Sequence, residues 1–149
     1  MRTILVALAT VALAAASLSA RAEIKSTTKL TVTADGSDSR INEITEEHVL
    51  RLSHVFTGRF IGEPIDTPVA SMPRYTITFD IQTHEGVKVA AYTVQYCVDA
   101  STGEAFVYLP GRGEPPYRRN LSTIIRDGHD GRWHRAAAEW RDALYPHLP

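Results

Sequence analysis

The chain has 149 residues, of which 16 are Lys or Arg and 17 are Asp or Glu, so its formal net charge at pH 7 is −1. This balance excludes the dense basic stripe that nucleic-acid-binding proteins use, and we expect no nucleic-acid partner. The single cysteine, Cys97, excludes an intrachain disulfide, so packing must stabilise the fold.

The N-terminus has the features of an export signal. Arg2 precedes the apolar run of residues 4–18, which is too short to span a bilayer stably, and the Ala-Arg-Ala of residues 20–22 has the spacing that a signal peptidase reads. We therefore expect residues 1–22 to be a cleaved signal peptide and residues 23–149 to form a single domain. The mature protein is expected to be periplasmic or secreted, with no membrane insertion after cleavage.

One strand and one helix are predicted first. Residues 29–34 alternate apolar and polar side chains, which is typical of a half-buried strand, and residues 35–39 form a turn. Residues 42–58 predict a helix, with Thr45 as its N-cap and Gly58 just after its C-terminus. The apolar face of this helix comprises Val49, Leu52, Val55 and Phe56.

A proline-rich connection at residues 61–73 leads into three predicted strands, residues 74–82, 87–100 and 105–109. Short turns between them favour an antiparallel meander with one buried face and one threonine-rich, solvent-facing face. Cys97 falls on the outer face, where we interpret its thiol as passive rather than reactive. The side chains expected to point inward from the middle strand are Tyr92, Val94, Tyr96 and Val98.

The C-terminal segment, residues 132–145, predicts a second helix whose apolar stripe begins at Trp133, with Pro146 ending it. The fold class expected is α+β. We predict an antiparallel sheet of four to five strands in the order β-α-β-β-β, packed by the first helix, with the C-terminal helix added.

Two segments resemble PepSY-type domains. The Ile-Thr-Glu-Glu-His-Val-Leu of residues 44–50 is similar to the start of their helix, and residues 96–108, which include Asp-Ala-Ser-Thr-Gly-Glu, are similar to the strand–turn–strand that closes them. The resemblance covers residues 44–109 and departs from the family pattern in the first strand, in residues 58–73 and after Leu109. It implies a non-catalytic exported module, of a kind often associated with proteases as an inhibitory or folding segment.

The histidines and aspartates of residues 127–134 have three interpretations. The Asp-Gly pairs favour a tight turn, with Asp130 capping the following helix. The second interpretation is that Asp127, His129 and His134 bind a metal ion or transfer protons. The third is that these residues form a polar contact patch. The spacing is not that of a calcium loop, and we predict no metal and no cofactor.

The region of residues 111–141 combines arginines with large aromatic residues, a mixture that is enriched at the centres of protein interfaces. Whether Trp133 belongs to the core or to such an interface stays open at this point. The candidate binding residues are Arg112, Tyr117, Arg118, Arg119, Arg126, His129, Arg132, Trp133 and His134.

The sequence contains no nucleophile elbow and no phosphate-binding loop, and we assign no catalytic residue. We therefore expect an exported, non-enzymatic binding or accessory module that inhibits or regulates another exported protein of the cell envelope. The alternative is a small periplasmic hydrolase or metal-dependent enzyme that uses Asp127, His129 and His134. A carrier of a small ligand, with its pocket between sheet and helix, is a third hypothesis.

Overall fold

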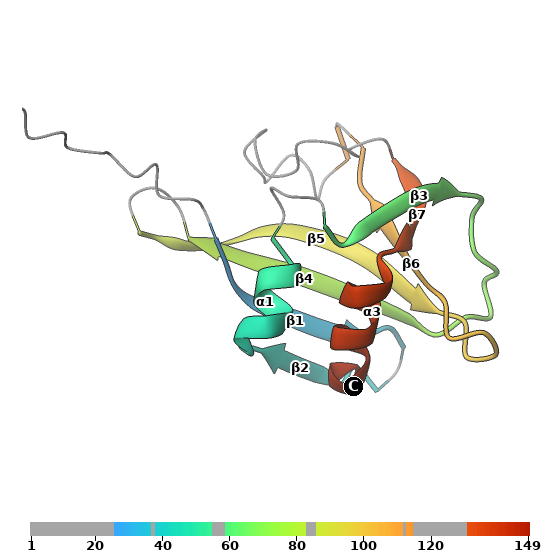
Figure 1. The fold of residues 1–149 in the computed structure, drawn as a ribbon, viewed down its shortest axis with the longest axis horizontal. Helices are drawn as coiled ribbons and strands as arrows, with labels where there is room; N and C mark the ends of the chain where they lie inside the picture. Colours follow the sequence, from blue (N-terminus) through green and yellow to red (C-terminus); the bar gives the residue numbers. More distant parts are fainter. Residues whose placement is uncertain (1–25, 37, 55–58, 83–85, 112, 115–130) are drawn as a thin grey trace, which may run out of the picture.

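A computed structural model describes residues 26–36, 38–54, 59–82, 86–111, 113–114 and 131–149. These residues form an antiparallel sheet, with two short helices on one of its faces (Figure 1). The elements in chain order are β1 (Thr27–Ala34), β2 (Ile41–Ile44), α1 (Glu47–Leu52), β3 (Ile61–Ile65), β4 (Arg74–Gln82), β5 (Lys88–Val98), β6 (Ala105–Leu109), β7 (Arg132–Ala136), α3 (Ala138–Leu144) and the 3-10 turn η1 (Tyr145–His147).

The described part of the sheet has seven strands in the order β2-β1-β4-β5-β6-β7-β3. The predicted mixture of antiparallel sheet and few helices is confirmed at this coarse level, but the predicted number of four to five strands is too small. The additional strands are β2, β3 and β7, each of only four or five residues. In strands this short, the alternation of apolar and polar side chains spans too few residues to be distinguished from the pattern of a helix or a loop.

The predicted meander is confirmed. β4 and β6 begin and end at the expected residues, and β5 is slightly shorter than expected. The inward-facing side chains of β5 are buried as predicted, with exposed fractions of 7% or less for Tyr92, Val94, Tyr96 and Val98.

The first predicted helix is much shorter than expected. Residues 41–44 form β2, which pairs with β1 from Leu30 opposite Ile44 to Thr33 opposite Ile41, and this pairing holds them in an extended conformation. The N-cap of α1 is Glu46 rather than Thr45, and it makes no side-chain capping hydrogen bond. Residues 55–58, with the expected C-terminal Gly58, lie outside the described residues.

The expected proline-rich connection contains a strand. Ile61–Ile65 forms β3 at one end of the described part of the sheet, where its only described partner is β7. An edge position tolerates Pro64 because one side of an edge strand needs no N–H donors. The register shifts between Ile61 and Pro64, which is consistent with this edge being irregular.

The C-terminal segment is also divided differently from the prediction. Residues 132–136 form β7, and α3 begins only at Ala138, with Ala137 as its N-cap. The prediction that Asp130 caps this helix is therefore wrong, because the helix starts eight residues later. Pro146 lies inside η1, directly after α3.

The main core lies between α1, α3 and the inner face of the sheet, and the two helices lie side by side there (Figure 1). The ring of Trp140 is at its centre, with ring centroids at 5.1 Å from Phe60, 5.4 Å from Tyr96 and 6.4 Å from Phe79. Because Trp140 is fully buried, its packing fixes α3 over β4 and β5.

A second, smaller cluster lies on the outer face, where Cys97, Phe106 and Trp133 are buried. Ile65 and Met72 pack against it from β3 and from the segment that precedes β4. Cys97 is on the outer face as predicted, but the expectation that this face is solvent-facing there is wrong, since its side chain has no exposed surface. None of the helices in the described part of the chain combines the length and apolarity needed to cross a bilayer.

Candidate functional site

Two arginine–aromatic pairs lie on the outer face of the sheet. The guanidinium carbon of Arg74, on β4, is 5.2 Å from the ring centroid of Trp133 on β7, and that of Arg135, also on β7, is 5.8 Å from the ring centroid of Phe106 on β6. Both distances are within the range of cation–π attraction. With Tyr108, whose ring centroid is 5.5 Å from that of Trp133, these residues form what we call the outer-face cluster.

Strand register places the two arginines of the cluster at the ends of one row. Arg74 is opposite Cys97 on β5, Cys97 is opposite Phe106, and Phe106 is opposite Arg135. Residues directly opposite one another in antiparallel strands project to the same face. The pleat of the sheet therefore points both guanidinium groups to the same side of the molecule.

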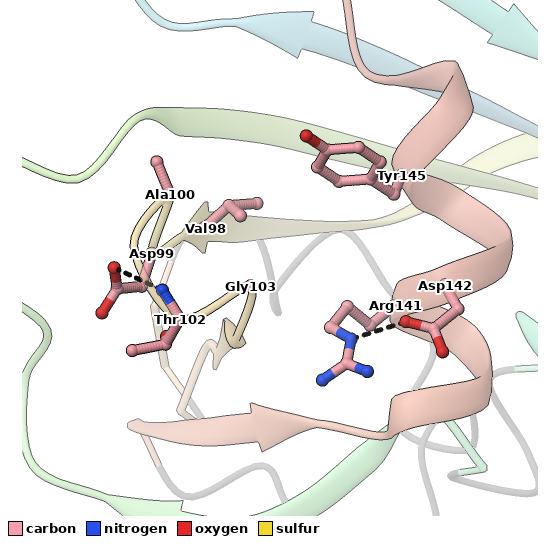
Figure 2. Close-up of a pocket in the computed structure, with 8 residues that line it drawn as sticks. All are labelled: Val98, Asp99, Ala100, Thr102, Gly103, Arg141, Asp142 and Tyr145. Atoms are coloured by element: carbon pink, nitrogen blue, oxygen red, sulfur yellow. Dashed lines mark hydrogen bonds and ion pairs between the residues drawn. The ribbon is translucent and has the colours of Figure 1, made fainter.

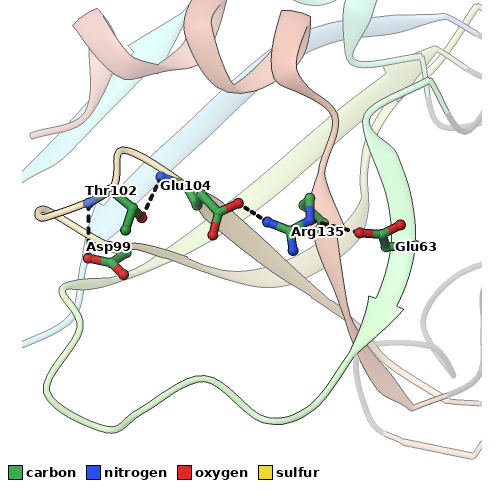
Figure 3. Close-up of polar contacts among 5 residues, drawn as sticks. All are labelled: Glu63, Asp99, Thr102, Glu104 and Arg135. Carbon is green, nitrogen blue, oxygen red and sulfur yellow. Dashed lines mark hydrogen bonds and ion pairs between the residues drawn. The ribbon is translucent and has the colours of Figure 1, made fainter.

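Arg135 is held by two carboxylates (Figure 3). Its Nε donates to Oε1 of Glu63 on β3 at 3.0 Å, and its Nη1 donates to Glu104, the residue directly before β6. The Arg135 side chain is 38% exposed, so water screens both ion pairs and each contributes little to stability. Their main effect is to fix the orientation of the guanidinium plane.

Glu104 is itself positioned by the turn that precedes β6. Its backbone N–H donates to Oγ1 of Thr102 at 3.2 Å, and the Thr102 N–H donates to Oδ1 of Asp99 (Figure 3). Hydrogen bonds and ion pairs therefore run continuously from the β5–β6 turn through Arg135 to β3. This continuity orders one border of the outer-face cluster.

Tyr108 and Glu114 order the opposite border. The Tyr108 hydroxyl donates to Oε1 of Glu114 at 3.0 Å, and the same carboxylate accepts the backbone N–H of Gly111. The tyrosine ring is thereby fixed beside Trp133.

The aromatic rings form the floor of the cluster and the guanidinium groups cover it. Phe106 is 7% exposed and Trp133 is 8% exposed, whereas Arg74 and Arg135 are half-buried. A surface of this kind suits recognition, since it offers planar cations that bind carboxylates in two-point geometry and stack on aromatic rings.

The thiol beneath the cluster is unsuited to nucleophilic catalysis. Burial raises the pKa of Cys97 to about 11, although the nearby charge of Arg74 acts in the opposite direction. The thiol is therefore protonated at neutral pH, and a protonated thiol is a poor nucleophile.

Three of the predicted binding residues lie on β7, but not on one surface. Arg132 is exposed, and Trp133 faces the outer cluster. His134 is 5% exposed, and its Nδ1 lies 3.2 Å from the carbonyl oxygen of Gly62. Successive residues of a strand point to opposite faces, so His134 and Trp133 cannot serve the same contact surface. The other candidates, Arg112, Tyr117, Arg118, Arg119, Arg126 and His129, lie outside the described residues, as does Asp127.

Sequence reasoning missed Arg74, Tyr108 and Arg135. Arg135 would have been found if residues 132–136 had been interpreted as a strand, because alternation then places it on the same face as Trp133. Arg74 is on β4 and Trp133 is on β7, with β5 and β6 between them in the chain, so no local pattern brings the two together.

Within the described ranges there is no group of three or more His, Cys, Asp or Glu side chains that could hold a metal ion. Comparison with known proteins gives no match to a family model, to a curated protein or to a solved structure.

Proposed function

We propose that the protein is an exported, non-enzymatic binding module that contacts another exported protein through its outer-face cluster and thereby inhibits or regulates it. The observation that carries this proposal is the pair of guanidinium groups held over buried aromatic rings on one face. Arg, Trp and Tyr are the residue types that most often supply binding energy at protein interfaces.

The fixed orientation of Arg135 favours binding. A free arginine side chain loses rotamer freedom when it is captured by a partner, and that loss opposes association. The carboxylates of Glu63 and Glu104 already restrain this side chain in the unbound protein. Less entropy is therefore lost when the complex forms.

The chemistry of the cluster indicates the partner surface that it fits. Among the described residues, Arg74 has one short-range polar contact, in which its Nη2 donates to the carbonyl oxygen of Pro68 at 3.5 Å, and this contact uses only part of its guanidinium group. We expect the partner to present a carboxylate to Arg74 and a flat apolar group against the ring of Tyr108.

Capture from an envelope extract tests the proposal. Wild-type protein is used as bait beside the double variant Arg74→Ala/Arg135→Ala, with Lys88→Ala as a control that removes an exposed charge at the far end of β5. We expect one partner to be enriched by the wild type and by the control, and to be lost with the double variant. Equal capture by all three baits, with unchanged melting temperatures, would place the contact elsewhere.

Photocrosslinking adds a positional readout. A photoreactive residue at position 63, where the exposed Glu63 side chain contacts Arg135, is expected to crosslink the captured partner, and the same residue at position 87 is not. Crosslinks from position 87 alone would contradict the assignment of the outer-face cluster.

A further inference from the structure

A hollow of about 330 Å³ lies between α3 and the turn that connects β5 to β6 (Figure 2). Val98 at the end of β5 contributes to its wall on the inner side of the sheet, and Arg141, Asp142 and Tyr145 line it from the helical segment. The volume is at the lower end of the range for small-molecule sites. The hollow is separate from the outer-face cluster, because Val98 and Cys97 face opposite sides of β5.

Arg141 places a guanidinium group in the hollow, and among the described residues only some of its hydrogen-bond donors are engaged. Its Nε donates to Oδ1 of Asp142 at 2.7 Å, which fixes one edge of the guanidinium group. Within the described part of the chain, neither of its terminal Nη atoms has a hydrogen-bond or ion-pair partner. The side chain is only 28% exposed, so these donors lie in a partly dehydrated position where a bound anion would be less screened than at an open surface.

The opposite wall is preformed by the β5–β6 turn. The N–H of Asp99 donates to the Glu104 carbonyl oxygen at 2.8 Å, and the N–H of Gly103 donates to the Asp99 carbonyl oxygen at 2.8 Å. The Asp99 carboxylate accepts from the Ser101 and Thr102 N–H groups and points toward the turn rather than toward Arg141 (Figure 2). A wall that is already ordered reduces the entropy that binding must overcome.

Apolar surface completes the hollow. Val98 is 7% exposed, and the ring of Tyr145, which is 64% exposed, projects from the helical segment toward it (Figure 2). A large aromatic side chain left this exposed beside a cation can cover the body of a ligand whose charged end is bound by the guanidinium group.

We propose that this hollow is a binding site for a small organic monocarboxylate with an apolar or aromatic body, its carboxylate paired with the free Nη edge of Arg141. The planar guanidinium fork matches a carboxylate in two-point geometry. A dianion such as a phosphate monoester is disfavoured, because Asp142 and Asp99 add two negative charges to the lining. This site goes beyond the proposed contact with a partner protein and does not depend on it.

Amide NMR of the isotopically labelled mature chain tests the site, with benzoate as the probe and benzamide as its neutral isostere. We expect benzoate to shift the resonances of residues 98–103 and 141–145 at millimolar concentration, and benzamide to shift them about tenfold less effectively. Phenyl phosphate is expected to bind more weakly than benzoate. The proposal is overturned if benzamide or phenyl phosphate binds as well as benzoate, or if the benzoate shifts map elsewhere.

Variants separate the guanidinium group from the rest of the hollow. Arg141→Gln is expected to weaken benzoate binding about tenfold or more, whereas Arg132→Gln, which removes an exposed arginine from β7, leaves it unchanged. Asp142→Asn is expected to strengthen binding, because it removes a negative charge beside the anion. This second variant keeps the test decisive even if Arg141→Gln fails to fold. Unchanged or weaker binding by Asp142→Asn, like undiminished binding by a folded Arg141→Gln, would refute the site.

Discussion

Trp140 donates its indole N–H to the Oγ of Ser53 at 2.8 Å, across 87 residues of sequence. The same Oγ donates to the Val49 carbonyl oxygen at 2.6 Å, and the Thr27 hydroxyl donates to the Ser53 carbonyl oxygen at 2.8 Å. A single buried serine thus joins α3, the end of α1 and β1. Every polar atom in this chain of contacts has a partner, as burial in an apolar core requires.

Replacement of Ser53 by Ala is expected to destabilise the protein by about 1–3 kcal/mol, because it leaves the buried indole N–H without an acceptor. Urea unfolding followed by tryptophan fluorescence measures the effect, with Ser71→Ala at an exposed position as the control. In a double-mutant cycle with Trp140→Phe, the two changes should be less than additive, since either one removes the hydrogen bond. Strict additivity would show that the bond contributes nothing.

Cys97 is expected to resist thiol reagents in the folded protein. Its side chain has no exposed surface, and burial raises its pKa to about 11, so at about pH 8 it is both covered and protonated. Reaction with Ellman's reagent should be slow in buffer and fast in denaturing urea. Comparable rates in the two conditions would mean that the segment over the second cluster opens readily.

Asp99 is expected to contribute to acid sensitivity. Hydrogen bonds from the Ser101 hydroxyl and N–H lower the pKa of its carboxyl below the ordinary value of 3.8. An acid with a lowered folded-state pKa stabilises the fold above its unfolded-state pKa and loses that contribution as the pH falls through its folded-state pKa. The difference in urea midpoint between wild type and Asp99→Asn should therefore be largest at neutral pH and shrink in acid. Asp38→Asn, at another exposed aspartate, serves as the control, and a difference that grows in acid would reverse the assignment.

Gly62 is expected to be sensitive to any added side chain. A Cβ at this position would lie 2.9 Å from the Arg135 carbonyl oxygen, so β3 would have to move away from β7. We expect Gly62→Ala to cost about 1–3 kcal/mol and to speed hydrogen exchange in β3. Glu63→Gln, which removes only an exposed ion pair on the same strand, should cost less than about 1 kcal/mol. Equal effects of the two changes would argue against the close approach.

The long strands could be predicted because their alternation is sustained. β4 places Ile77, Phe79 and Ile81 in the core and alternates them with polar residues over nine positions, so no other period fits. β6 could be predicted for a different reason. Its apolar run is short, but the turn sequence that directly precedes it indicates where the strand begins.

The C-terminal strand was hidden by a coincidence of spacing. Trp133, Ala136 and Trp140 are three and four residues apart, as on one face of a helix. In the structure Trp133 belongs to the second cluster and Ala136 to the main core, on opposite sides of β7. Residues three positions apart on a strand point to opposite faces of the sheet. Trp133 and Ala136 can both be buried because each face of the sheet carries a core.

The membership of the outer-face cluster could not be predicted from the sequence. Arginine and aromatic residues were expected to act together within residues 111–141, whereas the side chains that pack on Trp133 include Arg74 and Tyr108, which lie outside that region. The covering cation of Trp133, Arg74, is supplied by β4, which reaches β7 only through the register of β5 and β6. Long-range register depends on the whole sheet, so no short stretch of sequence encodes it.

The place of β3 at the end of the sheet imposes an order on assembly. β3 precedes β4 in the chain, yet among the described strands its only neighbour is β7, which is made of residues 132–136. Until β4, β5, β6 and β7 have paired in turn, the segment of residues 61–65 has no strand to join. Closing so long a loop is entropically unfavourable and is compensated only late in folding. The strand that carries Glu63 to Arg135 is therefore expected to be the last to join the sheet, so the outer-face cluster is complete only once the rest of the sheet has formed.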